Sequence, residues 1–418
     1  MAICVWTGNA QKIAQVTKVT PDSVEVDDVM TLTINDKAIS VTATANTAAN
    51  VIGLMITAIQ ASDIPEFKEV TPTDGTTYLI LTGPSSGKPV TVDGSADGTG
   101  TFEDAELTAA VSPNHVSHVD NWDTGVPTDG DTIIFDSGTR DCLYDLDALT
   151  AVSPAAVHIK KSYTGNIGLP PENTTYVEYR PKYLNIGIAS DAQAIAVYIG
   201  EGEGKGSSRI MLNTGDAETD IVMYDSASAT GTVPTVLWQG THAANTVVVT
   251  KGSLGIGFYA GEATVIEDLT IGSADPYSAG PKVVCGDDVD VDDIIMNSGS
   301  LVINGYSADA IETFVQNGGT STINGTDGVD SLVVRGGTCY FNSTGTLGGA
   351  PTVSGDGVID FSQDPRAKTV TNPIEVYGDS SQVNDPVKVV GSLVVDYNET
   401  TRFANLGRNL RVTRGATA

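Results

Sequence analysis

The chain has 418 residues, which is enough for two domains or for one elongated domain, and 45 of them are glycine. Charged residues make up 18% of the sequence, and their formal sum is -30 at neutral pH. This composition indicates a turn-rich β protein rather than helices stabilised by pairs of charges, and the acidic balance argues against nucleic-acid binding by the body as a whole.

The beginning of the chain, from Met1 to Gly8, lacks the basic start and the apolar stretch of a secretory signal. No apolar run reaches the length that spans a bilayer, so we expect no membrane contact. The sequence therefore predicts a protein that is made and folded in the cytoplasm. The cysteines form no Cys-x-x-Cys pair, which favours free buried thiols over a zinc site or a disulfide framework. They are Cys4, Cys142, Cys285 and Cys339.

Residues 14–118 have the pattern of a small α+β unit. Apolar and polar side chains alternate on either side of Asn35, which is typical of a β-hairpin. Thr47 can cap a helix that ends before Pro65. The apolar face of this predicted helix consists of Val51, Ile52, Met55, Ile56 and Ile59. With further short strands at residues 77–81 and 90–92, the helix would cover one face of a small sheet.

After Trp122 the sequence consists of short apolar runs separated by Gly, Asn, Asp and Ser. Three segments superpose without gaps, residues 298–305, 318–325 and 336–343. Their aligned glycines, with the next one in the series, are Gly299, Gly319, Gly337 and Gly357. A period of about 20 residues fits one coil of a parallel β-solenoid, in which glycine provides the positive φ angle that sharp corners need.

Asn304, Asn324 and Asn342 occupy the same position in these repeats. We expect them to lie at one corner of the solenoid and to form hydrogen bonds along the stack, while inward Val, Ile and Leu side chains form apolar columns. The alternative is an ordinary β-sandwich in which the repeated sequence motif reflects composition alone.

Two segments, Val5-Trp6-Thr7-Gly8 and residues 121–135, resemble the halves of a motif that opens many bacterial β-helix proteins, including autotransporter-type passengers. In that motif a Trp-x-Gly start is followed, after a short spacer, by Asn-Trp, a Pro and Gly-Asp before an apolar strand. The second half is present here as Asn121-Trp122, Pro127 and Gly130-Asp131. The resemblance implies a right-handed parallel β-helix whose first coil is interrupted, so that Trp6 and Trp122 meet in its cap.

The predicted organisation has four parts. Residues 1–13 form the first strand or cap of the β-helix, residues 14–118 an inserted α+β domain, residues 119–369 the β-helix, and residues 370–418 a C-terminal β segment. The inserted unit also resembles a module common in tailed-phage structural proteins, through residues 32–44 and the Thr-Ala-Ala-Asn start of its helix. An insertion requires termini that lie close together, which small domains often satisfy.

Few side chains suggest chemistry. His115 and His118 lie near Asp120 and Asp123, which could in principle hold a metal, but surface histidines in a linker are the preferred interpretation. The glycine-rich residues 200–208 look like a phosphate loop, yet the lysine is followed by Gly and no helix pattern follows, so a turn is favoured. The sequence predicts no catalytic residue, cofactor or metal.

One acidic run could attract Ca²⁺. Asp288, Asp290 and Asp292 alternate along a predicted strand, so their carboxylates would project from one face and offer hard oxygen ligands. The same is true of Asp216, Glu218 and Asp220. A solvated acidic face that keeps the solenoid soluble and its edges unpaired is the alternative, and it is the one we favour.

The end of the chain differs from the body because no acidic residue follows Glu399. Its basic side chains are Arg402, Arg408, Arg411 and Arg414. A basic, partly apolar tail on an acidic protein predicts a docking strand that closes the solenoid or meets an acidic partner or a neighbouring subunit. The alternative is a frayed terminus with incidental arginines.

These features predict a non-enzymatic structural protein of a tailed-phage virion, made in the host cytoplasm, most specifically a capsid decoration or cement protein that stabilises the head. The resemblance and symmetry imply a homotrimer, and the expected partners are other virion proteins such as the major capsid protein. A tail fibre, tailspike or surface adhesin that binds host glycans is the first alternative. A polysaccharide depolymerase built on a β-helix is the second.

Overall fold

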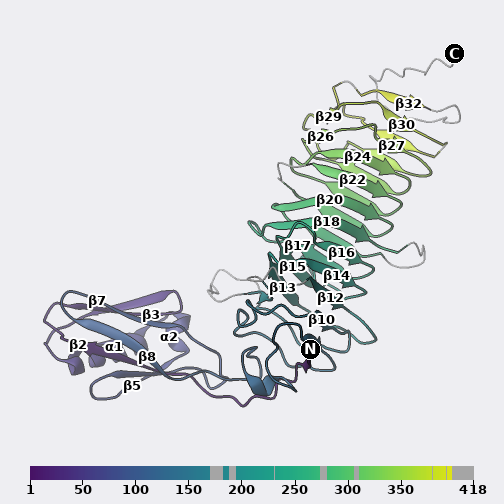
Figure 1. Cartoon of the computed structure of the whole chain (residues 1–418). Coiled ribbons are helices and arrows are strands. Elements are labelled where there is room, and N and C mark those ends of the chain that lie inside the picture. The colour runs from purple at the N-terminus through teal and green to yellow at the C-terminus, as the bar shows by residue number, and fades with distance from the viewer. Residues whose placement is uncertain are drawn as a thin grey trace.

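The computed structural model is mostly β, with two long parallel sheets and a smaller unit beside their N-terminal end (Figure 1). It describes residues 1–169, 182–187, 194–229, 231–273, 280–305, 310–378, 380–391 and 393–397.

The larger parallel sheet has fifteen strands within the described residues. Its path runs through β1 (Ile3–Val5), β9 (Thr132–Phe135), β10 (Ala156–Ile159), β12 (Ile195–Ile199), β14 (Thr219–Met223), β16 (Thr246–Val249), β18 (Thr264–Ile271), β20 (Val289–Met296), β22 (Ile311–Gln316), β24 (Val329–Val334), β27 (Thr352–Val353), β30 (Ile374–Val376) and β32 (Val395–Tyr397), with β26 (Thr346–Leu347) and β29 (Thr369–Val370) paired beside it.

The second parallel sheet has ten strands in the described part of the chain. They are β11 (Leu184–Asn185), β13 (Ile210–Gly215), β15 (Val236–Gly240), β17 (Ser253–Ile256), β19 (Lys282–Cys285), β21 (Ser300–Ile303), β23 (Thr320–Ile323), β25 (Thr338–Phe341), β28 (Val358–Asp360) and β31 (Gln382–Asn384). From β11 to β25 successive strands fall in alternate sheets, so each pass of the chain adds one strand to both. This parallel pairing differs from the antiparallel pairing of a β-sandwich.

The spacing of the predicted repeat matches the pairing of residues between neighbouring strands of the ten-stranded sheet. Ser300 pairs with Thr320, Thr320 with Thr338, and Thr338 with Val358, which reproduces the spacing of the aligned glycines. At the corner before these strands, Gly299, Gly319 and Gly337 have φ angles of 92°, 82° and 72°. The prediction that glycine occupies corners with a positive φ angle is therefore confirmed. Parallel pairing continues beyond residue 369, through β30, β31 and β32.

The predicted asparagine ladder is also confirmed. Nδ2 of Asn324 donates to Oδ1 of Asn304 over 3.0 Å, and Nδ2 of Asn342 donates to Oδ1 of Asn324 over 3.1 Å. Nδ2 of Asn304 donates to the Cys285 carbonyl, so the chain of bonds joins the ends of four successive strands of the ten-stranded sheet. Each bond satisfies a polar group that the stacked backbone would otherwise leave half-buried and unpaired.

One continuous core lies between the two parallel sheets, because alternate side chains of every strand point inward. In β16 the burial alternates so that Val247 and Val249 are fully buried while Val248 is 37% exposed. The same core extends from Cys4 near the N-terminus to Val395 in β32. The cysteines are free and buried, as predicted, and burial raises the pKa of Cys285 to about 12 and of Cys339 to about 11.

The smaller unit has two antiparallel sheets, β5-β6-β2-β8 and β4-β3-β7. Its elements are β2 (Val16–Asp22), β3 (Val29–Ile34), β4 (Lys37–Thr42), α1 (Ala48–Ala61), α2 (Pro65–Lys68), β5 (Thr71–Asp74), β6 (Leu79–Thr82), β7 (Val92–Asp97) and β8 (Thr101–Thr108). The predicted hairpin around Asn35 is β3–β4, and Thr47 caps α1 by accepting a hydrogen bond from the Asn50 N–H. Buried residues of this unit, from Val19 to Phe102, form a core separate from that of the parallel sheets.

Residues far apart in the sequence meet where the smaller unit joins the parallel sheets. The rings of Trp6 and Trp122 lie 5.1 Å apart, edge to face. Ile13 and Val111 exchange two backbone hydrogen bonds of 2.8 and 3.0 Å, so the chain leaves and returns at the same point. Because β1 pairs with β9, the N-terminal strand and the strand that follows the smaller unit are neighbours in one sheet.

A short 3-10 helix, η1 (Val119–Asn121), closes this junction. Asn121 is fully buried, and its Oδ1 accepts from the Ala10 N–H over 2.8 Å. Its Nδ2 donates to the carbonyls of Ser112 and His115 over 2.9 and 2.8 Å. One side chain therefore joins the segment that enters the smaller unit to the segment that leaves it.

Candidate assembly face

The outward side of the fifteen-stranded sheet carries a row of uncharged side chains, which we call the assembly column. The register of β12 to β24 aligns them as Tyr198, Val222, Val248, Thr270, Ile295, Val315 and Val333. At a strand spacing of about 4.8 Å the column is about 29 Å long. Val248 and Ile295 are 37% and 45% exposed. Such a row differs from scattered apolar residues, which are normal on any protein surface.

Polar rows border the assembly column on both sides. On one side the register aligns Asp220, Thr246, Asp268, Asp293, Thr313 and Ser331. On the other side Asn317 donates to Oδ1 of Asn297 over 2.9 Å and accepts from Arg335 over 3.1 Å. An apolar centre with a polar rim is the usual anatomy of a protein interface.

The column begins at a pair of stacked rings. His158 in β10 and Tyr198 in β12 have ring centroids 4.7 Å apart and an interplanar angle of 20°. Nδ1 of His158 lies 2.7 Å from a carboxylate oxygen of Glu201, so the imidazole is held between the sheet and the turn that follows β12. His158 is therefore held in place by contacts within the chain.

The interpretation of His115 as a surface linker residue is wrong. Its side chain is 2% exposed; Nδ1 lies 2.9 Å from Oδ2 of Asp145, and Nε2 lies 2.7 Å from the Gly87 carbonyl oxygen. Local composition suggested a linker, but the smaller unit folds back and supplies Gly87. His118, by contrast, caps η1 by accepting from the Asp120 N–H. His115 therefore ties the smaller unit to the main body.

The acidic residues proposed as weak Ca²⁺ ligands do alternate as predicted. Asp288 is exposed, and Asp290 and Asp292 are half-buried on the outward side of β20, with Val289 and Val291 buried between them. In the part of the chain that the structure describes, no three His, Cys, Asp or Glu side chains are grouped closely enough to hold a metal ion.

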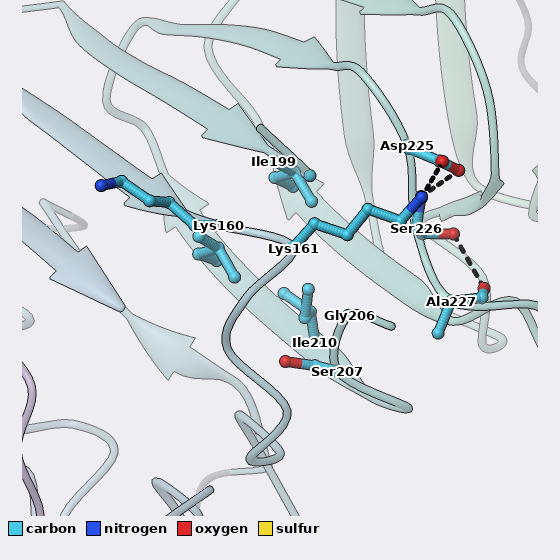
Figure 2. Close-up of a pocket in the computed structure, with 11 residues that line it drawn as sticks. Lys160, Lys161, Ile199, Gly206, Ser207, Ile210, Asp225, Ser226 and Ala227 are labelled. Atoms are coloured by element: carbon cyan, nitrogen blue, oxygen red, sulfur yellow. Dashed lines mark hydrogen bonds and ion pairs between the residues drawn. The ribbon is translucent and has the colours of Figure 1, made fainter. Parts of the chain in front are cut away.

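The glycine-rich residues 200–208 form a turn that leads into a strand, β13, rather than into a helix. Gly200, Gly202, Gly204 and Gly206 all have positive φ angles, which explains the alternating glycines. Figure 2 shows the small pocket beside this turn, where the Lys161 side chain extends to an ion pair with Asp225. Its cavity is about 10 Å³, room for one water molecule.

A second lysine, Lys160, points away from this pocket in Figure 2 and stabilises the Asp136 carboxylate. Its Nζ donates over 2.8 Å, and with hydrogen bonds from Ser162 and Ser137 it lowers the pKa of Asp136 to about 2. Because the pKa is lower in the folded state than the unfolded value of about 4, the contribution to stability is present above pH 4 and is lost as the pH falls towards 2.

Asp136→Asn is therefore expected to lower the free energy of unfolding by about 1–2 kcal/mol at pH 7, allowing for partial exposure. At pH 2, the folded-state pKa, most of this difference should have been lost. Denaturant unfolding across this pH range tests the expectation, with Asp147→Asn, at an exposed position, as the control. A constant difference from pH 7 to pH 2 would contradict it.

The arginines predicted to dock, Arg402, Arg408, Arg411 and Arg414, lie outside the described residues. No protein-family model matches the chain, and neither a curated protein nor a solved structure is significantly similar to it. Among the described residues, no helix is both long enough and apolar enough to cross a membrane. The assembly column was missed from the sequence because an all-apolar run such as Val247-Val248-Val249 does not reveal which side chain points outward.

Proposed function

We propose that the chain is a right-handed parallel β-helix that serves as a non-enzymatic structural protein of a tailed-phage virion, and that it assembles through the assembly column. The alternation of strands between two parallel sheets and the in-register repeat support the β-helix. The observation that carries the function is the uncharged column itself, because it offers a long contact surface on a protein whose formal charge is -30.

The proposed assembly is a homotrimer in which three chains lie side by side. Three elongated bodies can bury one long face each about a common axis, and the closed symmetry leaves no assembly column exposed. The polar rows would form the rim of each contact and fix its alignment. A surface that uses side chains from seven strands also explains why the register of β12 to β24 matters for function as well as for folding.

The structural role is supported by how the reactive side chains are used. His115 and His158 are engaged with carboxylates, and Cys285 and Cys339 are buried in the core with raised pKa values. Thiolates are the reactive form of cysteine, so a raised pKa favours the inert thiol. These groups maintain the fold.

Within the virion we propose that the chain is a capsid decoration or cement protein in contact with the major capsid protein. Two features support this role. The smaller unit, which resembles a phage structural module, extends from one end of the parallel sheets (Figure 1). The basic tail that contains Arg402, Arg408, Arg411 and Arg414 provides a charge opposite to that of the body, suited to an acidic partner surface.

Charge placed in the assembly column tests the proposal. The double variant Val248→Asp and Ile295→Asp buries unpaired carboxylates in each contact, which costs several kcal/mol, so the trimer should dissociate to monomers of 43.3 kDa. Val302→Asp is the matched control, because Val302 is a half-buried outward valine on the ten-stranded sheet. Light scattering after size exclusion gives the masses, and circular dichroism confirms folding. Equal masses for the double variant and the control would contradict the assigned face.

A further inference from the structure

The imidazole of His115 connects the smaller unit to the main body. Its Nδ1 lies 2.9 Å from Oδ2 of Asp145, which is in the segment between β9 and β10. Its Nε2 lies 2.7 Å from the carbonyl oxygen of Gly87, which is in the loop between β6 and β7 of the smaller unit. Because the side chain is 2% exposed, these two groups take the place of water at the ring nitrogens.

Both groups that face the ring nitrogens of His115 are hydrogen-bond acceptors. A backbone carbonyl and an ionised carboxylate accept but do not donate, and the Asp145 carboxylate also accepts from the Ser117 hydroxyl. A neutral imidazole has one N–H group and can satisfy only one of them, whereas an imidazolium donates from both nitrogens. The two distances are those of normal N–H···O bonds, so the geometry fits an imidazolium.

The carboxylate of Asp145 is the charge in direct contact with the ring. The elements that hold His115 carry further titratable side chains, Lys88, His118, Asp141 and Tyr144. Lys88 is ion-paired with Glu69 over 2.7 Å, and Asp141 accepts from the Asn166 N–H over 2.7 Å. His118 caps η1, and the Tyr144 ring lies 5.1 Å from the imidazole, tilted against it. The charge on the imidazole is therefore balanced mainly by Asp145.

Loss of one proton from His115 would affect its two contacts unequally. A neutral ring with its proton on Nδ1 keeps the bond to the Asp145 carboxylate, which is the stronger because its acceptor is charged. The lone pair of Nε2 then points at the Gly87 carbonyl oxygen, and the two repel each other. The opposite tautomer would place a lone pair against the carboxylate, which is less favourable still. Deprotonation therefore removes the contact with the smaller unit.

Gly87 also covers the point where the chain enters and leaves the smaller unit. Its φ angle is 74°, and a Cβ atom there would lie 1.9 Å from the Val111 carbonyl oxygen. Val111 in turn exchanges two backbone hydrogen bonds with Ile13. A movement of Gly87 away from His115 would uncover this pair of strands.

We propose that His115 is a pH-sensitive latch, which fixes the smaller unit against the parallel sheets while the imidazole carries both protons and releases it when one proton is lost as the pH rises. Release changes the position of the smaller unit and leaves both hydrophobic cores folded, because these cores consist of other residues. The latch does not involve the assembly column, so it stands or falls independently of the proposed trimer.

NMR of the full-length protein, labelled with nitrogen-15 at histidine, measures the protonation of each ring nitrogen. At about pH 5.5 both nitrogens of His115 should carry a proton, and at about pH 9 only Nδ1 should do so. The signals of His115 are identified by their loss in His115→Gln. A ring that is neutral at the lower pH, keeps both protons at the higher pH, or keeps its last proton on Nε2 would overturn the proposal.

Hydrogen exchange at the amides of Ile13 and Val111 measures release of the smaller unit. After correction for the intrinsic effect of pH, their protection should fall about fivefold over this pH range, the change expected for the loss of one net hydrogen bond. Circular dichroism at both pH values checks that the chain stays folded. Unchanged protection in the folded chain would contradict the latch.

Asp145→Asn is the matched variant for this experiment. Asp145 has a φ angle of 53°, which asparagine also adopts readily. The amide can donate to Nδ1 of a neutral ring and leave the proton on Nε2 for Gly87, so protection should no longer depend on pH. His118→Asn keeps an acceptor at the cap of η1 and should retain the fivefold change. An equal fall in protection in Asp145→Asn, or its loss in His118→Asn, would overturn the assignment to His115.

Discussion

Trp122→Ala is expected to lower the free energy of unfolding by about 3–5 kcal/mol, the cost of emptying a buried aromatic site. Trp122 is 4% exposed and packs against Trp6 and, at 6.1 Å, against Phe135. Its Nε1 also donates to the Val116 carbonyl over 2.8 Å. The side chain thus holds the N-terminal strand against the first strand after the smaller unit. Denaturant unfolding followed by circular dichroism measures the loss.

Two further variants serve as controls for the loss of stability in Trp122→Ala. Trp122→Phe keeps an aromatic ring but removes the hydrogen bond, so it should cost less than Trp122→Ala. Val119→Ala changes a neighbouring side chain that is 57% exposed and should cost under about 0.5 kcal/mol. If Trp122→Ala were no more costly than Val119→Ala, the two tryptophans would not be the contact that holds β1 against β9.

Removing the smaller unit is expected to leave the parallel sheets folded. Ile13 and Val111 exchange both backbone hydrogen bonds, which is the pairing that closes a two-residue hairpin. Replacing residues 14–110 by Asn-Gly should therefore reconnect the chain without strain. The expected cost is about 1 kcal/mol, for the lost hydrogen bond between His115 and the Gly87 carbonyl. Residues 14–111 produced alone should unfold cooperatively, because their core is separate.

The matched control is a longer deletion that is closed by the same Asn-Gly turn. Replacing residues 10–114 by Asn-Gly also deletes the Ile13–Val111 pair. It further removes the hydrogen bond that the Ala10 N–H donates to Oδ1 of Asn121. This longer deletion should be markedly less stable than the shorter one. Equal loss of structure in both shortened chains would show that the smaller unit is needed for the rest to fold.

The local features of the fold could be predicted from the sequence. The cap at Thr47, the hairpin around Asn35 and the asparagine ladder each depend on residues with a strong conformational preference or on a strict repeat. The first half of the parallel sheets is harder to predict. Ala156 pairs with Ala196, whereas Ile195 pairs with Thr219, which is much closer along the sequence. The turns between these strands therefore differ in length, and this conceals the repeat.

The functional surfaces could be predicted only in part. The burial of His115 depends on Gly87, which lies across a whole folded unit. Contacts of this kind arise from tertiary packing and leave no periodic pattern in the sequence.

The mass of the unmodified chain in dilute solution tests the central claim most directly. One chain is 43.3 kDa, so mass photometry should show a single species of about 130 kDa if three assembly columns are buried about one axis. A species of 43.3 kDa in this measurement that also persists in light scattering at micromolar concentration would contradict assembly through this face.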